Sequence, residues 1–230
     1  MSSTTWDDSR GPKPLDWEDY WGRRNDGGSL YAVIASIYRK YIIKPRLNRF
    51  VRKYFEPGAS LLHAGCGTGQ VDVDLHRDFK LTALDISPKA LALYQLQNPG
   101  SKALLSSIFD IRLGPRSLDG IYNLGVLEHF SESEIHQILK ELHRVLRDSG
   151  KLLIFWPPEF GLSVLFFKGL CGLSKVFLKR SPQFHPPEPS RLKSKNEAIR
   201  IFSESGFRVL EYSFSFSDLW TYAVVVAEKR

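Results

Sequence analysis

The sequence has 230 residues, of which 43% are hydrophobic and 25% are charged. These proportions are those of an ordinary globular protein, and they exclude collagen-like, coiled-coil and disordered chains. The net charge of +7 is concentrated in two segments, 39–53 and 160–195, which favours an anionic surface or substrate over a generally basic protein. Neither segment carries a nucleic-acid-binding signature, so we expect no nucleic acid partner.

The cysteine content and the first residues bear on the cellular compartment. Two cysteines are too few for a secreted domain built on disulfides. The polar opening MSSTTWDDSRGPKP contains no apolar signal segment. We therefore expect a cytoplasmic protein.

The first quarter of the chain differs in pattern from the rest. Residues 1–14 are expected to form a disordered tail, and residues 15–56 an N-terminal cap of two or three helices interrupted near Pro45, because proline cannot continue a helix interior. The rest is expected to form one domain, 57–158 and 191–230, interrupted by a helical insertion or lid at 159–190.

From residue 57 onwards, short apolar runs alternate with longer amphipathic segments. The expected strands are 59–65, 80–86, 101–107, 118–126 and 150–156, and the expected helices between them are 69–79, 88–98 and 131–148. This alternation predicts a parallel sheet with helices on both faces. A helix over 193–206 is followed by two strands, 207–216 and 220–229, whose short connection forces an antiparallel pair.

The segment LLHAGCGTGQ is the strongest functional signal. A strand leads into Gly65, Gly67 and Gly69, where the backbone can approach a ligand closely, and the helix predicted to follow would present free amides. Asp85 lies 20 residues after Gly65 at the end of the next strand, where a carboxylate can accept both hydroxyls of a ribose. Together they predict a nucleoside-binding site. Gln70 stands where the GxGxxG fingerprint of nicotinamide and flavin proteins needs glycine.

With these motifs the sequence resembles the class I S-adenosylmethionine-dependent methyltransferases, particularly those acting on small molecules and lipids. HAGCGTG is similar to the first motif of that family, LDIS to its ribose-binding motif, LDGIYNLGVLEHF and RVLRDSGKLLIFWPP to its fourth- and fifth-strand motifs, and WEDYW to its N-terminal cap. The resemblance implies an α/β fold: a doubly wound, Rossmann-like seven-stranded sheet in the order 3-2-1-4-5-7-6, with strand 7 antiparallel, an N-terminal helical cap and a helical insertion.

The resemblance also implies S-adenosylmethionine as the cofactor. The residues expected to bind it are Tyr20, Trp21, His63, Gly65, Cys66, Gly67, Gly69, Asp85, Ile86, Ser107, Ile108 and Leu124. Of these, Cys66 is interpreted as a small packing residue of the glycine turn rather than a nucleophile.

Two positions depart from the family pattern. The family usually has an acid at the position of His63, where it holds the cofactor's ammonium. A neutral histidine can accept a hydrogen bond there, whereas a charged one would repel the ammonium. Ser107 stands where an Asp often receives the adenine amino group, and the Ile108 amide can donate to the ring. These departures leave open the alternative of a non-catalytic cofactor-binding scaffold or regulatory module.

Methyl transfer needs few catalytic side chains, because the sulfonium is already electrophilic. Glu128 and His129 follow the fourth strand, at the edge where open α/β sheets bind ligands, and His185 lies in a proline-rich loop. We expect these three as catalytic or acceptor-orienting residues. Metal-assisted relatives carry ExxEH at this point; Gly125 replaces the first glutamate, so no metal site is expected.

The acceptor is expected to be small and apolar or amphiphilic. Lys168, Lys175 and Lys179 form a narrow basic stripe on an otherwise apolar helical segment, 160–180. Such a segment fits a lid over the acceptor, an interfacial anchor on an anionic membrane, or a helix packed on the core. The expected partners are therefore a small-molecule or lipid-like acceptor and an anionic membrane surface. A nicotinamide-dependent oxidoreductase is the enzyme alternative, disfavoured by Gln70; the sequence does not indicate the oligomeric state.

Overall fold

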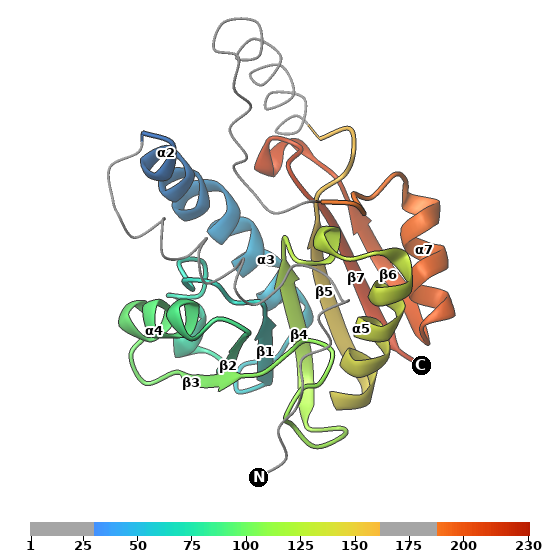
Figure 1. The fold of residues 1–230 in the computed structure, drawn as a ribbon, viewed down its shortest axis with the longest axis horizontal. Coiled ribbons are helices and arrows are strands. Elements are labelled where there is room, and N and C mark those ends of the chain that lie inside the picture. Colours follow the sequence, from blue (N-terminus) through green and yellow to red (C-terminus); the bar gives the residue numbers. More distant parts are fainter. Residues whose placement is uncertain (1–29, 162–187) are drawn as a thin grey trace, which may run out of the picture.

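The computed structural model describes residues 30–161 and 188–230 (Figure 1). Its centre is a seven-stranded sheet in the order β3-β2-β1-β4-β5-β7-β6. The strands are β1 (Ser60–Ala64), β2 (Lys80–Asp85), β3 (Lys102–Leu105), β4 (Leu118–Leu124), β5 (Leu146–Trp156), β6 (Phe207–Ser213) and β7 (Ala223–Lys229). β1 to β5 pair in parallel, and β7 pairs antiparallel with both β5 and β6. The predicted doubly wound fold and its strand order are confirmed.

Helices cover both faces of this sheet. The helices on the sheet are α3 (Lys44–Tyr54), α4 (Pro88–Gln97), α5 (Glu132–Val145) and α7 (Lys195–Glu204), and α2 (Leu30–Tyr38) precedes α3 beyond the edge of the sheet (Figure 1). Short segments connect the elements: η1 (Arg39–Ile43), η2 (Leu75–Arg77), η3 (Leu127–His129) and η4 (Phe216–Asp218). Leu62 and Ala64 of β1 belong to the core formed with α5 and α7, whereas Leu61 belongs to the core formed with α3. Because side chains alternate along a strand, His63 lies on the α3 side.

The predicted break of the cap at Pro45 is a change of helix type rather than an interruption. Pro45 lies in the first turn of α3, and because it has no N–H it leaves one position of the helical hydrogen-bond pattern unfilled. Directly before it, η1 is a π-helical segment of five residues that keeps the chain helical between α2 and α3. The described part of the cap is thus one unbroken helical run over 30–54. The tail 1–14, the first half of the cap and most of the insertion lie outside the described residues.

The helix predicted over 69–79 is not formed. The chain runs through successive turns in which each amide bonds to the carbonyl three residues back, at Gly69, Asp72, Leu75 and Asp78, and only η2 is helical. Val71, Val73 and the aspartates favour helix weakly, and the buried Asp72 uses its carboxylate for other contacts. The apolar spacing was therefore misleading in this segment.

Smaller differences concern the ends of elements. α5 ends at Val145 and β5 begins at Leu146, whereas the predicted helix reached residue 148 and the predicted strand began at 150. Leu146 pairs with Leu118 and so belongs to the sheet. The connection between β6 and β7 is longer than predicted and contains η4. No helix in the described part of the chain is long and apolar enough to cross a membrane.

Candidate functional site

The glycine turn after β1 lies at the carboxyl edge of the parallel strands. Gly65, Gly67 and Gly69 have φ angles of 76°, 51° and 69°, a conformation that side-chain-bearing residues rarely adopt. A Cβ at Gly65 would lie 2.5 Å from Cγ2 of Val126, and a Cβ at Gly69 would lie 2.3 Å from the ring of Tyr94. These two glycines are therefore required by contacts within the protein itself.

The amides of this turn are used internally. The N–H groups of Gly65 and Cys66 donate to the carbonyl of Leu84, at 2.8 and 2.9 Å, and the N–H of Gly69 donates to the carbonyl of Cys66. The N–H of Gly67 donates to Oδ2 of Asp85 at 2.9 Å. The helix that was expected to present free amides to a ligand is not formed, and these four amides of the turn are already bonded within the protein. The Cys66 side chain packs with α4, and burial raises the pKa of its thiol.

Asp85 ends β2 beside the glycine turn and is buried. Its Oδ2 accepts from Gly67, and its Oδ1 accepts from the N–H of Ser87 at 3.0 Å. Burial raises the pKa of Asp85, while these two backbone donors act in the opposite direction. An ionised carboxylate offers about four acceptor positions, so Asp85 keeps the capacity to accept further hydroxyl groups. Ile86, the next residue, is half-buried.

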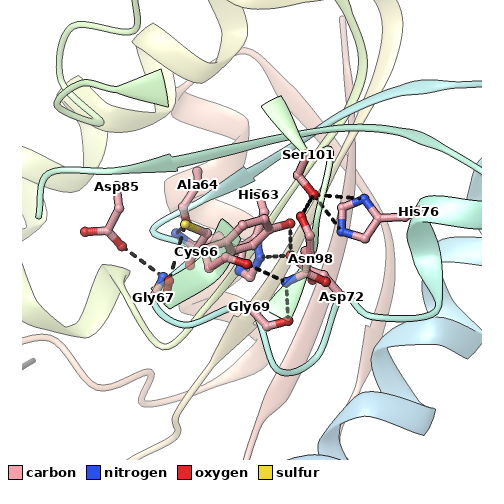
Figure 2. Close-up of polar contacts among 12 residues, drawn as sticks. His63, Ala64, Cys66, Gly67, Gly69, Asp72, His76, Asp85, Asn98 and Ser101 are labelled. Atoms are coloured by element: carbon pink, nitrogen blue, oxygen red, sulfur yellow. Dashed lines mark hydrogen bonds and ion pairs between the residues drawn. The ribbon is translucent and has the colours of Figure 1, made fainter. Parts of the chain in front are cut away.

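A buried polar cluster lies beneath the glycine turn (Figure 2). Nδ1 of His63 is 2.7 Å from Oδ2 of Asp72, and the hydroxyl of Tyr94 donates to the same oxygen at 2.7 Å. The His63 ring also stacks on Tyr122, with 4.5 Å between ring centroids. Oδ1 of Asp72 is buried without a hydrogen-bond partner in the part of the chain that the structure describes. His63, expected to face the cofactor's ammonium, therefore has one ring nitrogen committed to Asp72.

The other predicted cofactor residues follow β3 and β4. Oγ of Ser107 accepts from the N–H of Phe109 at 3.1 Å, and Ile108 is buried in the core on the α5 side. Leu124 is half-buried at the end of β4. Because β1, β2, β3 and β4 are parallel, Asp85, Ser107 and Leu124 share one edge of the sheet with the glycine turn. Tyr20, Trp21 and His185 lie outside the described residues.

Glu128 and His129 lie in η3, directly after β4, and both are buried. Among the described residues, Oε2 of Glu128 has no hydrogen-bond partner. Burial, with a contribution from the charge of Glu188, raises the pKa of this carboxyl to about 8. A Cβ at Gly125 would lie 3.2 Å from Oε1 of Glu128 and 3.3 Å from the hydroxyl of Tyr222. Gly125 thus leaves room between a carboxyl and a phenol at the carboxyl edge.

Three side chains of this region carried no signal in the sequence. Asp72, Tyr94 and Tyr222 reach the site through contacts between distant segments, which no local pattern reports. Gln70 departs from the GxGxxG pattern, and its structural role was not predicted. Its side chain accepts from Nε of Arg39 at 2.8 Å and donates to Oγ of Ser36 at 3.4 Å. It therefore joins the helical cap to the glycine turn.

Comparisons with known proteins agree with this arrangement. Residues 62–154 match a family model described as a methyltransferase domain. A probable tRNA methyltransferase 9B of Mus musculus is 28% identical over 123 residues, which are 50% of this chain and 25% of that protein. A probable S-adenosylmethionine-dependent methyltransferase of Mycobacterium tuberculosis is 26% identical over 150 residues, 65% of this chain and 47% of that protein. This chain spans less than half the length of these two relatives.

The fold is shared with solved structures at low sequence identity. The crystal structure of magnesium protoporphyrin IX methyltransferase from Synechocystis PCC 6803, with bound S-adenosylhomocysteine, superimposes with a TM-score of 0.66. The match covers 92% of this chain and 94% of that one, at 18% identity. At this identity the likeness concerns the fold alone.

Proposed function

We propose that this chain, which belongs to the class I S-adenosylmethionine-dependent methyltransferase family, transfers a methyl group from S-adenosylmethionine to a small apolar or amphiphilic acceptor. The observation that carries the proposal is the carboxylate of Asp85, held by two backbone amides beside the glycine turn and able to accept ribose hydroxyls. When bound, the cofactor supplies a methyl group on a positively charged sulfur. Ser107, Ile108 and Leu124 would line the nucleoside part of the site.

The internal hydrogen bonding of the glycine turn favours this cofactor over a nicotinamide dinucleotide. A dinucleotide places its pyrophosphate on free amides at a helix N-terminus. Four amides of this turn are already bonded, and turns follow in place of a helix. S-adenosylmethionine carries no phosphate, and its ribose hydroxyls and its ammonium require acceptors such as the Asp85 carboxylate. The oxidoreductase alternative is accordingly disfavoured by the turn itself as well as by Gln70.

Glu128 is proposed to handle a proton on the acceptor side. Its carboxyl is buried, and its Oε2 has no hydrogen-bond partner within residues 30–161 and 188–230. Its pKa of about 8 lies close to neutrality, as suits a group that gives or takes a proton. Tyr222 faces the same space over Gly125, and burial raises the pKa of its hydroxyl, which therefore remains a donor. Together they would orient an acceptor hydroxyl or amine and remove its proton as the methyl group arrives.

The acceptor class rests on this chain rather than on its relatives. The relatives are named for acceptors as different as tRNA and magnesium protoporphyrin IX, so they do not point to one compound. An amphiphilic acceptor partitions into lipid bilayers, and the proposal therefore includes a peripheral position of the chain at a membrane surface. The non-catalytic scaffold stays a second candidate on one observation: His63 is engaged by Asp72, which removes one acceptor from the cofactor's ammonium.

Calorimetry separates these possibilities. The parent protein is titrated with S-adenosylmethionine, S-adenosylhomocysteine and NAD, and we expect binding of the first two only. Asp85→Ala removes charge-assisted hydrogen bonds worth ~1.5–3 kcal/mol each, so affinity should fall by at least about tenfold. Asp78→Ala, which alters an exposed carboxylate paired with Arg52, is the matched control and should bind normally.

A screen of acceptors with labelled methyl donor then tests catalysis. Transfer of label to an amphiphilic acceptor supports the enzyme, and cofactor binding without any transfer supports the scaffold. Binding of NAD, or unchanged affinity in Asp85→Ala, would refute the assigned site.

A further inference from the structure

The outer surface of the helical cap carries an exposed apolar stripe. Val33, Ile34, Ile37 and Tyr41, from α2 and η1, each leave about half or more of their surface exposed. At 100° per residue, the first three fall within an arc of about 100° on the helix. Large aliphatic side chains grouped on one exposed helix face are unusual on a monomeric protein and mark an interaction surface. We call these four residues the α2 stripe.

The same helical run faces the site with its other side. Ser36 and Arg39 contact Gln70 next to the glycine turn, and the hydroxyl of Tyr38 donates to the carbonyl of Asp218, which precedes β7. The cap therefore lies at the carboxyl edge of the sheet (Figure 1). Ser36 and Arg39 contact Gln70 there, whereas the residues of the α2 stripe are exposed. A surface that covered the stripe would lie close to the site.

A basic groove adjoins the α2 stripe. Its volume is about 500 Å³, and Tyr41 of the stripe also lines it. Four cationic side chains, Lys40, Lys44, Arg49 and Arg52, line the groove against one carboxylate, Asp74, which pairs with Lys44 at 2.9 Å. Within the described part of the chain, no acidic side chain lies within ion-pair distance of Lys40 or Arg49. The groove thus has an excess of positive charge next to an aliphatic surface.

We propose that the α2 stripe and the basic groove form a docking surface for an anionic lipid bilayer. The stripe inserts between the acyl chains near the interface, while Lys40 and Arg49 bind lipid phosphates. An apolar stripe next to a basic groove fits a lipid bilayer better than a nucleic acid. A nucleic acid would bind the cations but leave the α2 stripe exposed to water. This inference specifies the peripheral position included in the proposed function. It places the membrane on the cap, beside the site that an amphiphilic acceptor has to reach.

Cosedimentation with lipid vesicles tests the proposal without cofactor or acceptor, so its outcome is independent of methyl transfer. Vesicles of phosphatidylcholine with phosphatidylglycerol are compared with vesicles of phosphatidylcholine alone. The parent should bind the anionic vesicles, and salt should weaken this binding because exposed charges are screened. Ile34→Ser with Ile37→Ser should lower the partition coefficient at least about tenfold, as should Lys40→Glu with Arg49→Glu.

Matched controls lie on other surfaces of the molecule. Leu96→Ser alters an apolar side chain of α4 that is 78% exposed, and Lys102→Glu alters an exposed cation of β3; both should bind like the parent. Equal loss in the controls, equal binding to both vesicle types, or no binding by the parent would overturn the proposal. Binding of the parent to tRNA, reduced by Lys40→Glu with Arg49→Glu but not by Ile34→Ser with Ile37→Ser, would also overturn it. A parent dimer that Ile34→Ser with Ile37→Ser converts to monomers without loss of vesicle binding would overturn it as well. Circular dichroism verifies that each variant is folded.

Discussion

Two buried carboxyl groups of the site, Asp72 and Glu128, have different surroundings. Asp72 accepts from the hydroxyl of Tyr94 and bonds to the ring of His63, so it ties β1 to α4 through the turn that follows the glycines. Glu128 has one oxygen without a partner and a raised pKa. The buried carboxylate of Asp72 therefore stabilises the fold through its hydrogen bonds, whereas the buried carboxyl of Glu128 can exchange a proton near neutral pH.

Asp72→Ala should lower the free energy of unfolding by about 2–4 kcal/mol, because it leaves two buried polar groups, on His63 and Tyr94, without their partner. Asp74→Ala is a close control, since Asp74 is half-exposed and forms a surface ion pair with Lys44; its effect should stay below about 1 kcal/mol. Urea denaturation measures both. Similar losses in the two variants would show that the buried cluster does not stabilise the turn.

Glu128 should make stability depend on pH. Its pKa rises from 4.5 in the unfolded chain to about 8 in the folded one, so between these values the folded state holds a proton that the unfolded state has released. Stability conferred by the protonated form therefore decreases as pH increases, by about 3 kcal/mol from about pH 5 to about pH 8. Glutamine at position 128 cannot ionise, so the free energy of unfolding of Glu128→Gln should fall less over this pH range than that of the parent.

Urea denaturation of the parent and of Glu128→Gln across that pH range measures the effect. Glu56→Gln, at an exposed position, should follow the parent. Parallel curves for the parent and Glu128→Gln would mean that the Glu128 carboxyl is ionised at neutral pH in the folded protein. The raised pKa, on which the proposed proton exchange of Glu128 near neutral pH rests, would then be refuted.

At the scale of elements, the glycine turn is fixed by its neighbours. Gly69 has φ of 69° and lies against the Tyr94 ring, whereas Gly58, with φ of 86°, has no atom within 4 Å of the position of a Cβ. Gly58→Ala should therefore cost only the backbone strain of about 1–2 kcal/mol, and Gly69→Ala should cost about 2–4 kcal/mol because steric overlap adds to it. Thermal or urea unfolding compares the two. Equal losses would mean that Tyr94 moves aside without cost.

Much of the fold was predictable from local patterns, and the exceptions have physical causes. The strands ending at Ala64 and Asp85 are short, mainly apolar and largely buried, as is typical of parallel strands, and their pattern predicts both the sheet and the position of Asp85. The spacing of apolar residues over 69–79 predicted a helix, but Asp72 is held by His63 and Tyr94, and tertiary contacts overrode local propensity. Glu128 and Tyr222 both lie next to Gly125 although they are distant in sequence, so no motif could reveal this arrangement.

At the scale of the whole molecule, a buried ion pair connects the cap to the last strands. Arg46 of α3 pairs with Asp218 of η4, and both side chains are buried. Arg46 also donates to the carbonyls of Ser213 and Tyr222, and Asp218 accepts from the N–H of Tyr222 at 2.9 Å. Segment 39–53 has seven basic residues, and its charge was interpreted as favouring an anionic surface or substrate. Arg46 is one of the seven, but its charge is used within the protein to pair with Asp218. It holds the cap in the position that brings α2 over the site.

Replacement of Arg46 tests this connection. Arg46→Met should lower the free energy of unfolding by about 3–5 kcal/mol, because it leaves Asp218 as an uncompensated buried charge. Arg46→Met combined with Asp218→Asn removes that charge and should recover part of the loss. Arg49→Met, three residues further along α3 and exposed, should change stability by less than about 0.5 kcal/mol. Urea denaturation gives the three values.

Hydrogen exchange of the cap amides should also accelerate in Arg46→Met, since the contact between α3 and η4 is weakened. A small loss in Arg46→Met, or no recovery in the double variant, would mean that the apolar core between α3 and the sheet positions the cap without help from the ion pair.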